Sequence, residues 1–162
     1  MLIYGVAAAA AIFLGVNLHH AASQRAALPN SHADSRIVVS LSERKLAVIK
    51  GGRVAGEYPV AIGKPDTPTP AGEFHVNDMQ SHPGPAAGVF GARWIEFNRR
   101  IAPDGVTHLD GIHGTNAPQL IGAAVSHGCI RMSNHDVEEV FRDAFVGEPV
   151  EIVDGPIDDG AR

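Results

Sequence analysis

The sequence predicts a β-rich α+β fold that is mainly β, with short helices. The chain has 162 residues, which is enough for one domain whose core needs neither a disulfide nor a metal ion. A hydrophobic content of 44% is typical of globular rather than disordered proteins. The 18 glycines and 11 prolines are dispersed along the chain and indicate many turns between short strands.

The N-terminal segment differs from the rest of the chain. Residues 2–18 contain no charged side chain, which is typical of an export signal or a short membrane span. Ala21-Ala22-Ser23 places small residues where a signal peptidase reads the chain. We therefore expect residues 1–23 to be a signal peptide, cleaved before Gln24, or an N-terminal membrane anchor. A buried N-terminal helix is the alternative.

Residues 24–35 are predicted to be a polar linker, and the domain after them to begin as a meander of β-hairpins. Apolar and β-branched runs are separated by short polar or glycine turns, as at residues 50–53. A proline-rich loop at 63–72 and an irregular loop at 79–88 interrupt the pattern, because proline cannot lie in a central strand. We expect strands at residues 36–41, 45–50, 54–62, 73–76, 89–97, 107–113 and 150–153.

One longer helix is predicted near the C-terminus, over residues 134–145. Ser133 is a suitable N-cap, and Asp136 at the third helical position completes a capping box. A turn or short helix is expected at 116–121, and the acidic tail at 154–162 is expected to be disordered. Gly147 ends the helix predicted at 134–145. The apolar stripe of this helix consists of Val137, Val140, Phe141 and Ala144.

Cys129 is the only cysteine, so no disulfide can form within the chain. A free cysteine is often a small, inert core residue, and that is one interpretation. The neighbouring residues favour a nucleophile instead. A thiol with a pKa of about 8.5 is mostly protonated at neutral pH and needs a base, for which His113 and His127 are both candidates.

The spacing around the cysteine constrains the geometry. His127 is two residues from Cys129, so in an extended loop the two side chains point the same way. In the strand expected at 107–113, Asp110 and His113 lie on opposite faces, which makes Asp110 a poor partner for orienting His113.

Backbone and basic groups near the cysteine could bind a reacting acyl group. Gly128 and the Cys129 amide are natural donors to a developing oxyanion. Arg131 can form a fork with a carboxylate on the substrate. Together with the histidines, these groups indicate acyl-transfer chemistry.

Composition and spacing disfavour a zinc site and a nucleic-acid partner. The zinc hypothesis has a possible ligand set in His108, His113, His127 and Cys129. Strand alternation places His108 and His113 on opposite faces, and no Cys-x-x-Cys or His-Glu-x-x-His spacing is present. A net charge of −5 without a basic stripe argues against nucleic acid.

Ordered segments along most of the chain resemble the L,D-transpeptidase (YkuD) catalytic domain family. The resemblance covers residues 36–153. At position 131 members of this family carry Asn or Arg, and this chain has Arg131. The segments that carry the resemblance are Ile112-His113-Gly114-Thr115-Asn116, Ser126-His127-Gly128-Cys129-Ile130-Arg131-Met132, Tyr58–Gly63, Thr67–Phe74, Phe90–Ile95 and Gly147–Ile152.

The resemblance implies a β-sandwich or barrel with short helices and a cysteine-dependent L,D-transpeptidase of peptidoglycan. Cys129 would attack the carbonyl of the third residue of a tetrapeptide stem, release D-alanine and retain the stem as a thioester. His113 would be the general base and later the acid, oriented by the backbone carbonyl of Gly114. The other roles that the motif implies are an oxyanion site at His127, Gly128 and Cys129, and a substrate pocket shaped by Ser126 and Arg131.

The same resemblance implies no cofactor and no metal. The partners would be peptidoglycan stem peptides, with an acceptor amine from a second stem, which gives a 3→3 cross-link, or from a lipoprotein lysine or a free D-amino acid. If water were the acceptor, the enzyme would be an L,D-carboxypeptidase. A non-catalytic cell-wall binding module that has kept the fold is a further alternative. The resemblance and the predicted export segment together indicate a location in the periplasm or cell envelope, with a role in cell-wall biogenesis and cell shape.

Overall fold

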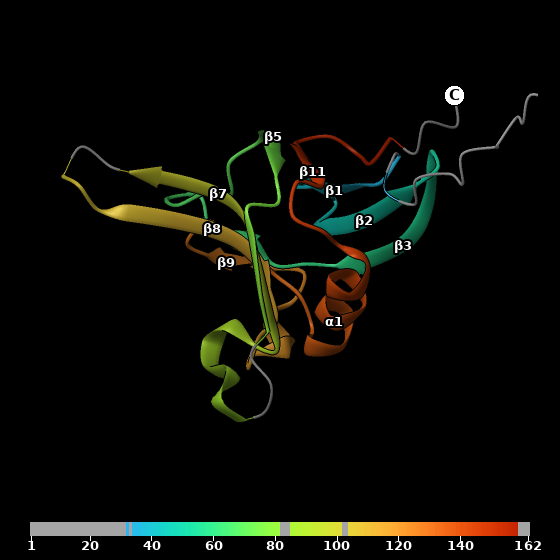
Figure 1. Ribbon diagram of the computed structural model, residues 1–162. Coiled ribbons are helices and arrows are strands. Elements are labelled where there is room, and N and C mark those ends of the chain that lie inside the picture. The colour runs from blue at the N-terminus through green and yellow to red at the C-terminus, as the bar shows by residue number, and fades with distance from the viewer. Residues whose placement is uncertain (1–31, 33, 82–84, 102–103, 159–162) are drawn as a thin grey trace, which may run out of the picture.

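The computed structural model describes residues 32, 34–81, 85–101 and 104–158 (Figure 1). The signal peptide or anchor expected at 1–23, and the part of the expected linker at 24–31, lie outside the described residues. Within the described part of the chain, no helix is long and apolar enough to cross a membrane.

A five-stranded sheet holds both ends of the domain together. Its order is β3-β2-β1-β11-β5. β1 pairs antiparallel with β2 and parallel with β11, so the first and last strands of the domain lie side by side. The strands are β1 (Arg36–Ser40), β2 (Lys45–Lys50), β3 (Arg53–Pro59), β5 (Gly72–His75) and β11 (Pro149–Val153).

The two central hairpin strands of this sheet are buried on both faces, which explains why their sequences are apolar with little alternation. On one face Ile37, Val39 and Leu46 join the main core. On the other face Val38 and Ala47 belong to a second, smaller cluster.

A second sheet carries the residues that the sequence analysis singled out. Its order is β10-β8-β7-β6, and β7 and β8 form a long hairpin that extends away from the body of the domain (Figure 1). A register shift interrupts the β7–β8 pairing between Glu96 and Asn98. The strands are β6 (Asp78–Ser81), β7 (Arg93–Ile101), β8 (Thr107–His113) and β10 (Ile130–Arg131). A separate parallel pair joins β4 (Ile62–Gly63) to β9 (Ala124–Ser126).

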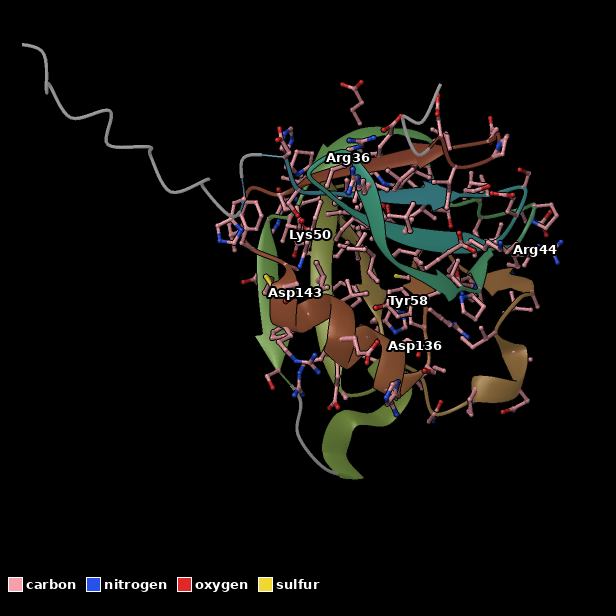
Figure 2. The ribbon with its side chains drawn as sticks, turned by 90° about the vertical axis from the view of Figure 1, so that its right-hand side faces the viewer. Arg36, Arg44, Lys50, Tyr58, Asp136 and Asp143 are labelled. Atoms are coloured by element: carbon pink, nitrogen blue, oxygen red, sulfur yellow. The ribbon has the colours of Figure 1, made fainter. Side chains whose placement is uncertain are left out.

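Among the described residues there is one α-helix, α1 (Asn134–Asp143), which contacts β7 and β8 of the second sheet. The Ser133 hydroxyl accepts the Asp136 backbone N–H, as an N-cap does. Polar contacts tie the helix to β2 and β3: Lys50 Nζ lies 2.7 Å from Asp143 Oδ2, and Tyr58 donates to Glu139 at 3.2 Å (Figure 2).

One apolar core unites the two sheets and the helix. Ile95 and Ile112 of the second sheet and Val137 and Val140 of α1 belong to the same buried cluster as Ile37 of the first sheet. The mainly β class with short helices is therefore confirmed.

The structure differs from the predicted elements between residues 78 and 101. Residues 79–81, expected in the irregular loop at 79–88, belong to β6, and Val89 and Phe90 end a 3-10 segment, η1 (Pro85–Phe90), rather than beginning a strand. Gly88 and Gly91, with φ of 53° and 63°, flank these two residues and break the extended conformation.

The tail also differs from its prediction, over residues 154–158. Ile157 packs against the smaller apolar cluster, and its backbone N–H donates to Glu43. The Ser40 hydroxyl donates to the Gly155 carbonyl at 2.7 Å. Gly155 and Ile157 thus hold this part of the tail on the five-stranded sheet, and Ile157 covers apolar side chains that would otherwise face water. The short helix expected at 116–121 is η2 (Pro118–Leu120).

Candidate active site

Parallel pairing of β10 with β8 brings the cysteine loop to the end of the histidine strand. Ile130 pairs with Ile112, and Arg131 with His113. Continued one residue back, this register places Cys129 beside Gly111. Because neighbouring residues of paired strands point to the same face, Cys129, Arg131 and His113 share one face. The Cys129 thiol donates to the Leu109 carbonyl oxygen at 3.9 Å.

A cavity of about 650 Å³ lies on this face. Its wall is part apolar and part basic, and it contains both the thiol and the imidazole. The lining residues are Gln80, Val89, Phe90, Trp94, Arg100, Thr107, His108, Leu109, Asp110, His113, His127, Cys129 and Arg131.

His113 is fixed by its backbone and by aromatic neighbours. Its side chain is 3% exposed, and Nδ1 lies 2.5 Å from the Gly114 carbonyl oxygen. A carbonyl oxygen only accepts hydrogen bonds, so Nδ1 carries the hydrogen and Nε2 keeps a lone pair. The ring stacks on Trp94 at 5.5 Å and meets the edge of Phe90 at 5.2 Å.

The environment keeps the His113 imidazole neutral. Burial, helped by the positive charge of Arg131, lowers the pKa of His113 from 6.5 to about 4. Hydrogen bonds to the Gly114 and Phe90 backbone act in the opposite direction but are outweighed. At neutral pH the ring can therefore accept a proton.

The Cys129 thiol is also neutral at rest. Burial raises its pKa, and the negative charge of Asp110 adds to this effect. The Gly111 backbone N–H and the Arg131 charge act in the opposite direction. The site thus rests as thiol and imidazole, not as a thiolate–imidazolium pair, and thiolate forms only when the proton is transferred.

Ser126 closes the loop that carries the cysteine. Its side chain is fully buried, donates to the Cys129 carbonyl at 2.5 Å and accepts the Gly128 N–H at 3.2 Å. Ser126 is not among the residues that line the cavity, so the substrate-pocket role expected for it would act through the loop that its hydroxyl holds. The Gly128 N–H, expected to face an oxyanion, is already bound by Ser126.

The two remaining motif residues both line the cavity. His127 is exposed, in contrast to the buried His113. Arg131 is half-buried, and its Nε has no hydrogen-bond partner among the described residues. Because this Nε is buried, a carboxylate ligand in the cavity would meet Arg131 through the rest of its guanidinium.

Comparison with known proteins identifies the family. The model of the YkuD L,D-transpeptidase catalytic domain matches residues 34–152. This chain is a member of that family. The Bacillus licheniformis protein named as the L,D-transpeptidase YkuD is 47% identical over 105 residues, which are 65% of this chain and 57% of that protein. The chain thus spans little more than half the length of this relative.

Two solved L,D-transpeptidase structures share the fold. The catalytic domain from Enterococcus faecium has 26% identity and a TM-score of 0.55, over 74% of this chain and 97% of that one. The L,D-transpeptidase LdtMt1, solved in complex with imipenem, has 28% identity and a TM-score of 0.55, over 74% and 59% of the two chains. The family and fold expected from the sequence motifs are therefore confirmed.

A residue of this family member that sequence reasoning missed is Asn134, the first residue of α1. Its Oδ1 accepts the backbone N–H groups of Ala92 at 3.1 Å and Thr115 at 3.2 Å. Side chains at Gly91 or Gly114 would collide with this oxygen. Asn134 therefore joins the two segments that flank His113. Its position next to a helix cap was the only available sequence signal.

The possible zinc ligands do not gather at one point. Among the described residues, no three His, Cys, Asp or Glu side chains are placed to share a metal ion. His113 uses Nδ1 on the Gly114 carbonyl, and the Cys129 thiol donates to Leu109. His108 lies near the turn of the β7–β8 hairpin, opposite Arg100.

Proposed function

We propose that this protein is a cysteine-dependent L,D-transpeptidase that acts on peptidoglycan stem peptides in the cell envelope. The observation that carries the proposal is a thiol and a neutral imidazole on one face of a parallel strand pair, both facing one cavity. The family match to residues 34–152 supports the same chemistry.

The first half-reaction forms a thioester. His113 Nε2 takes the Cys129 proton as the sulfur attacks the carbonyl of the third stem residue. The Cys129 backbone N–H is the loop amide left for the developing oxyanion, because the Gly128 N–H is bound to Ser126. The imidazolium then donates its proton to the leaving nitrogen, and D-alanine departs.

The second half-reaction reverses these roles. An acceptor amine gives a proton to neutral His113 and attacks the thioester, which restores the thiol and forms a new amide. The buried position of His113 and its lowered pKa favour return of the ring to the neutral form after each proton transfer. With water as the acceptor, the product would be a trimmed tripeptide.

Arg131 is the proposed anchor for a stem carboxylate. Arg131 lines the same cavity as Cys129, and its side chain carries the positive charge that a carboxylate needs. A bidentate contact would place the peptide so that its carbonyl faces the sulfur. The apolar wall formed by Phe90, Trp94 and Leu109 would bury the stem's aliphatic parts.

Incubation of the full chain in mild detergent with a disaccharide tetrapeptide, followed by mass spectrometry, tests the proposal. We expect release of D-alanine and a cross-linked dimer, both lost in Cys129→Ala. Cys129→Ala tests the nucleophile directly, since loss of the sulfur removes the acyl-enzyme step. Unchanged D-alanine release by Cys129→Ala would refute the mechanism, and a trimmed tripeptide without dimer would identify the carboxypeptidase instead.

A carbapenem separates catalysis from simple wall binding. The β-lactam carbonyl acylates an activated thiol and leaves a covalent mass increment. We expect this increment on the wild type and none on Cys129→Ala. A protein that binds peptidoglycan without forming any adduct would support the binding-module alternative.

A further inference from the structure

Asp110, which alternates with His113 along β8, packs against the nucleophile loop at Gly128. The carboxylate is 2% exposed, and continuing the β8–β10 register places it beside Gly128. A Cβ added to Gly128 would lie 2.5 Å from Asp110 Oδ1. Gly128 has φ of +124°, so its conformation and its lack of a side chain both suit this close approach.

Two side chains of β7 donate hydrogen bonds to this buried carboxylate. Asn98 Nδ2 donates to Asp110 Oδ2 at 2.8 Å, and Arg100 Nη2 donates to the same oxygen at 3.1 Å. The β-bulge after Glu96 sets this alignment, since it makes Asn98 the cross-strand partner of Asp110. Arg100 is more than half exposed and also lines the cavity. The Arg100–Asp110 ion pair therefore connects the buried side of the loop to the cavity wall.

We propose that Asp110 is a positioning residue whose carboxylate, balanced by Asn98 and Arg100, supports the Gly128-Cys129 segment and tunes the reactivity of the Cys129 thiol. The inference rests on the proposed function only in taking Cys129 as the nucleophile. Asp110 touches no reacting atom. It acts through the loop it supports and through its charge.

The charges around the thiol explain why the balance matters. Among the residues that line the cavity, Asp110 is the only carboxylate, and its charge opposes formation of the thiolate. Arg100 binds Asp110 directly and offsets that effect, while Arg131 favours the thiolate from the neighbouring strand. The ionisable side chains that line the cavity with Cys129 are Arg100, His108, Asp110, His113, His127 and Arg131.

The pH dependence of iodoacetamide alkylation, measured on the full chain, tests the charge effect. Asp110→Asn keeps the shape but removes the charge, so we expect alkylation at pH 7 to rise roughly three- to tenfold, which corresponds to a half to one unit in thiol pKa. Arg100→Gln leaves the carboxylate unbalanced, and alkylation should fall roughly threefold. In the double variant that combines Asp110→Asn with Arg100→Gln, the arginine substitution should have less effect than it has alone, because the carboxylate that Arg100 binds is absent.

Carbapenem acylation tests the support of the loop. Asp110→Ala removes both charge and shape, so we expect alkylation to rise as in Asp110→Asn while acylation falls at least about tenfold, because acylation needs the oriented loop. Asp110→Asn should retain acylation. This split between the two reactions is not expected if Asp110 only stabilises the fold.

Arg36→Gln is the matched control. Arg36 contacts a carboxylate, Glu151, on the five-stranded sheet, so the same substitution there should leave both rates unchanged. An unchanged alkylation profile in both Asp110→Asn and Arg100→Gln would overturn the inference. Arg100 is largely exposed, so its variant should fold even if Asp110→Asn does not.

The inference and the proposed function can fail separately. Alkylation shifts without D-alanine release from any stem peptide would leave Asp110 as a modulator of the thiol and refute the transpeptidase proposal. D-alanine release with an unchanged alkylation profile in both variants would support the transpeptidase proposal and refute the role of Asp110.

Discussion

The two larger sheets of this protein are built differently. Strands β1 and β2 are buried over nearly their whole length, with an apolar cluster on each face. The β7–β8 hairpin is buried at one end only, and at its other end Ile101 is 73% and Leu109 40% exposed. His113 and Cys129 lie where β8 and the start of β10 face the cavity. The reactive residues therefore lie on a hairpin and loop that are only partly buried, and not on the strands that are buried on both faces.

The largest expected effect on stability is in the five-stranded sheet. Ile37 is fully buried in the main core, so Ile37→Ala should lower the free energy of unfolding by about 2–5 kcal/mol through lost burial and a cavity. The rate of carbapenem acylation per folded molecule should not change. Leu109→Ala, at the exposed end of the hairpin, is the control and should cost less than about 1 kcal/mol in urea unfolding. Similar losses in both variants would contradict the contrast.

The next largest effect is a pH dependence of stability that comes from His113. Because the pKa of His113 falls from 6.5 in the unfolded chain to about 4 in the folded one, the unfolded state binds more protons between these values. Stability from this residue is fully present above pH 6.5 and is lost as pH falls toward 4, by up to about 3 kcal/mol.

Urea unfolding of the wild type and of His113→Gln across this pH range measures the difference. Glu148, whose pKa is raised by burial, titrates in both proteins and cancels in the comparison. Identical pH dependence in the two proteins would mean that His113 is not held neutral by burial.

Substitution of Asn134 should have an intermediate effect on both stability and acylation. Asn134→Ala removes the acceptor of two backbone N–H groups next to His113. We therefore expect the free energy of unfolding to fall by roughly 1–3 kcal/mol and carbapenem acylation to slow. Asn134→Asp keeps an acceptor oxygen and should restore most of the acylation rate. Normal acylation by Asn134→Ala would show that these segments do not need the asparagine to hold the imidazole.

The smallest predicted effect concerns the helix cap. Ser133→Ala removes the hydroxyl that accepts the Asp136 N–H, and the thermal midpoint should drop by an amount equivalent to about 1 kcal/mol. Ser133→Thr keeps the hydroxyl, and its thermal midpoint should drop much less. An equal loss in both variants would argue against capping as the source.

Sequence patterns predicted the fold class well where local pattern and packing agree. The strand at 107–113 matches β8 in both bounds, and the helix at 134–145 differs from α1 only at its C-terminal end. Prediction failed near Val89 and Phe90, where apolar residues look like a strand but line the cavity instead. Periodicity alone does not distinguish an apolar side chain in a core from one that faces a cavity.

The local parts of the site were also visible in the sequence, and the distant parts were not. His113, Cys129 and Arg131 lie within one short region of the chain. The contacts of Asn134 with Ala92 and of Arg100 with Asp110 depend on which strands and loops the fold brings together. A β-bulge sets the second of these contacts, and composition gave no sign of it.

The parallel register of β10 against β8 has a consequence for how this site can change. Side chains alternate along each strand, so a shift of β10 by one residue against β8 would turn the thiol to the opposite face of the sheet. A shift of two residues would preserve its direction. The register of β10 is therefore restricted by parity, and a one-residue shift that leaves the cysteine intact would still separate it from its base.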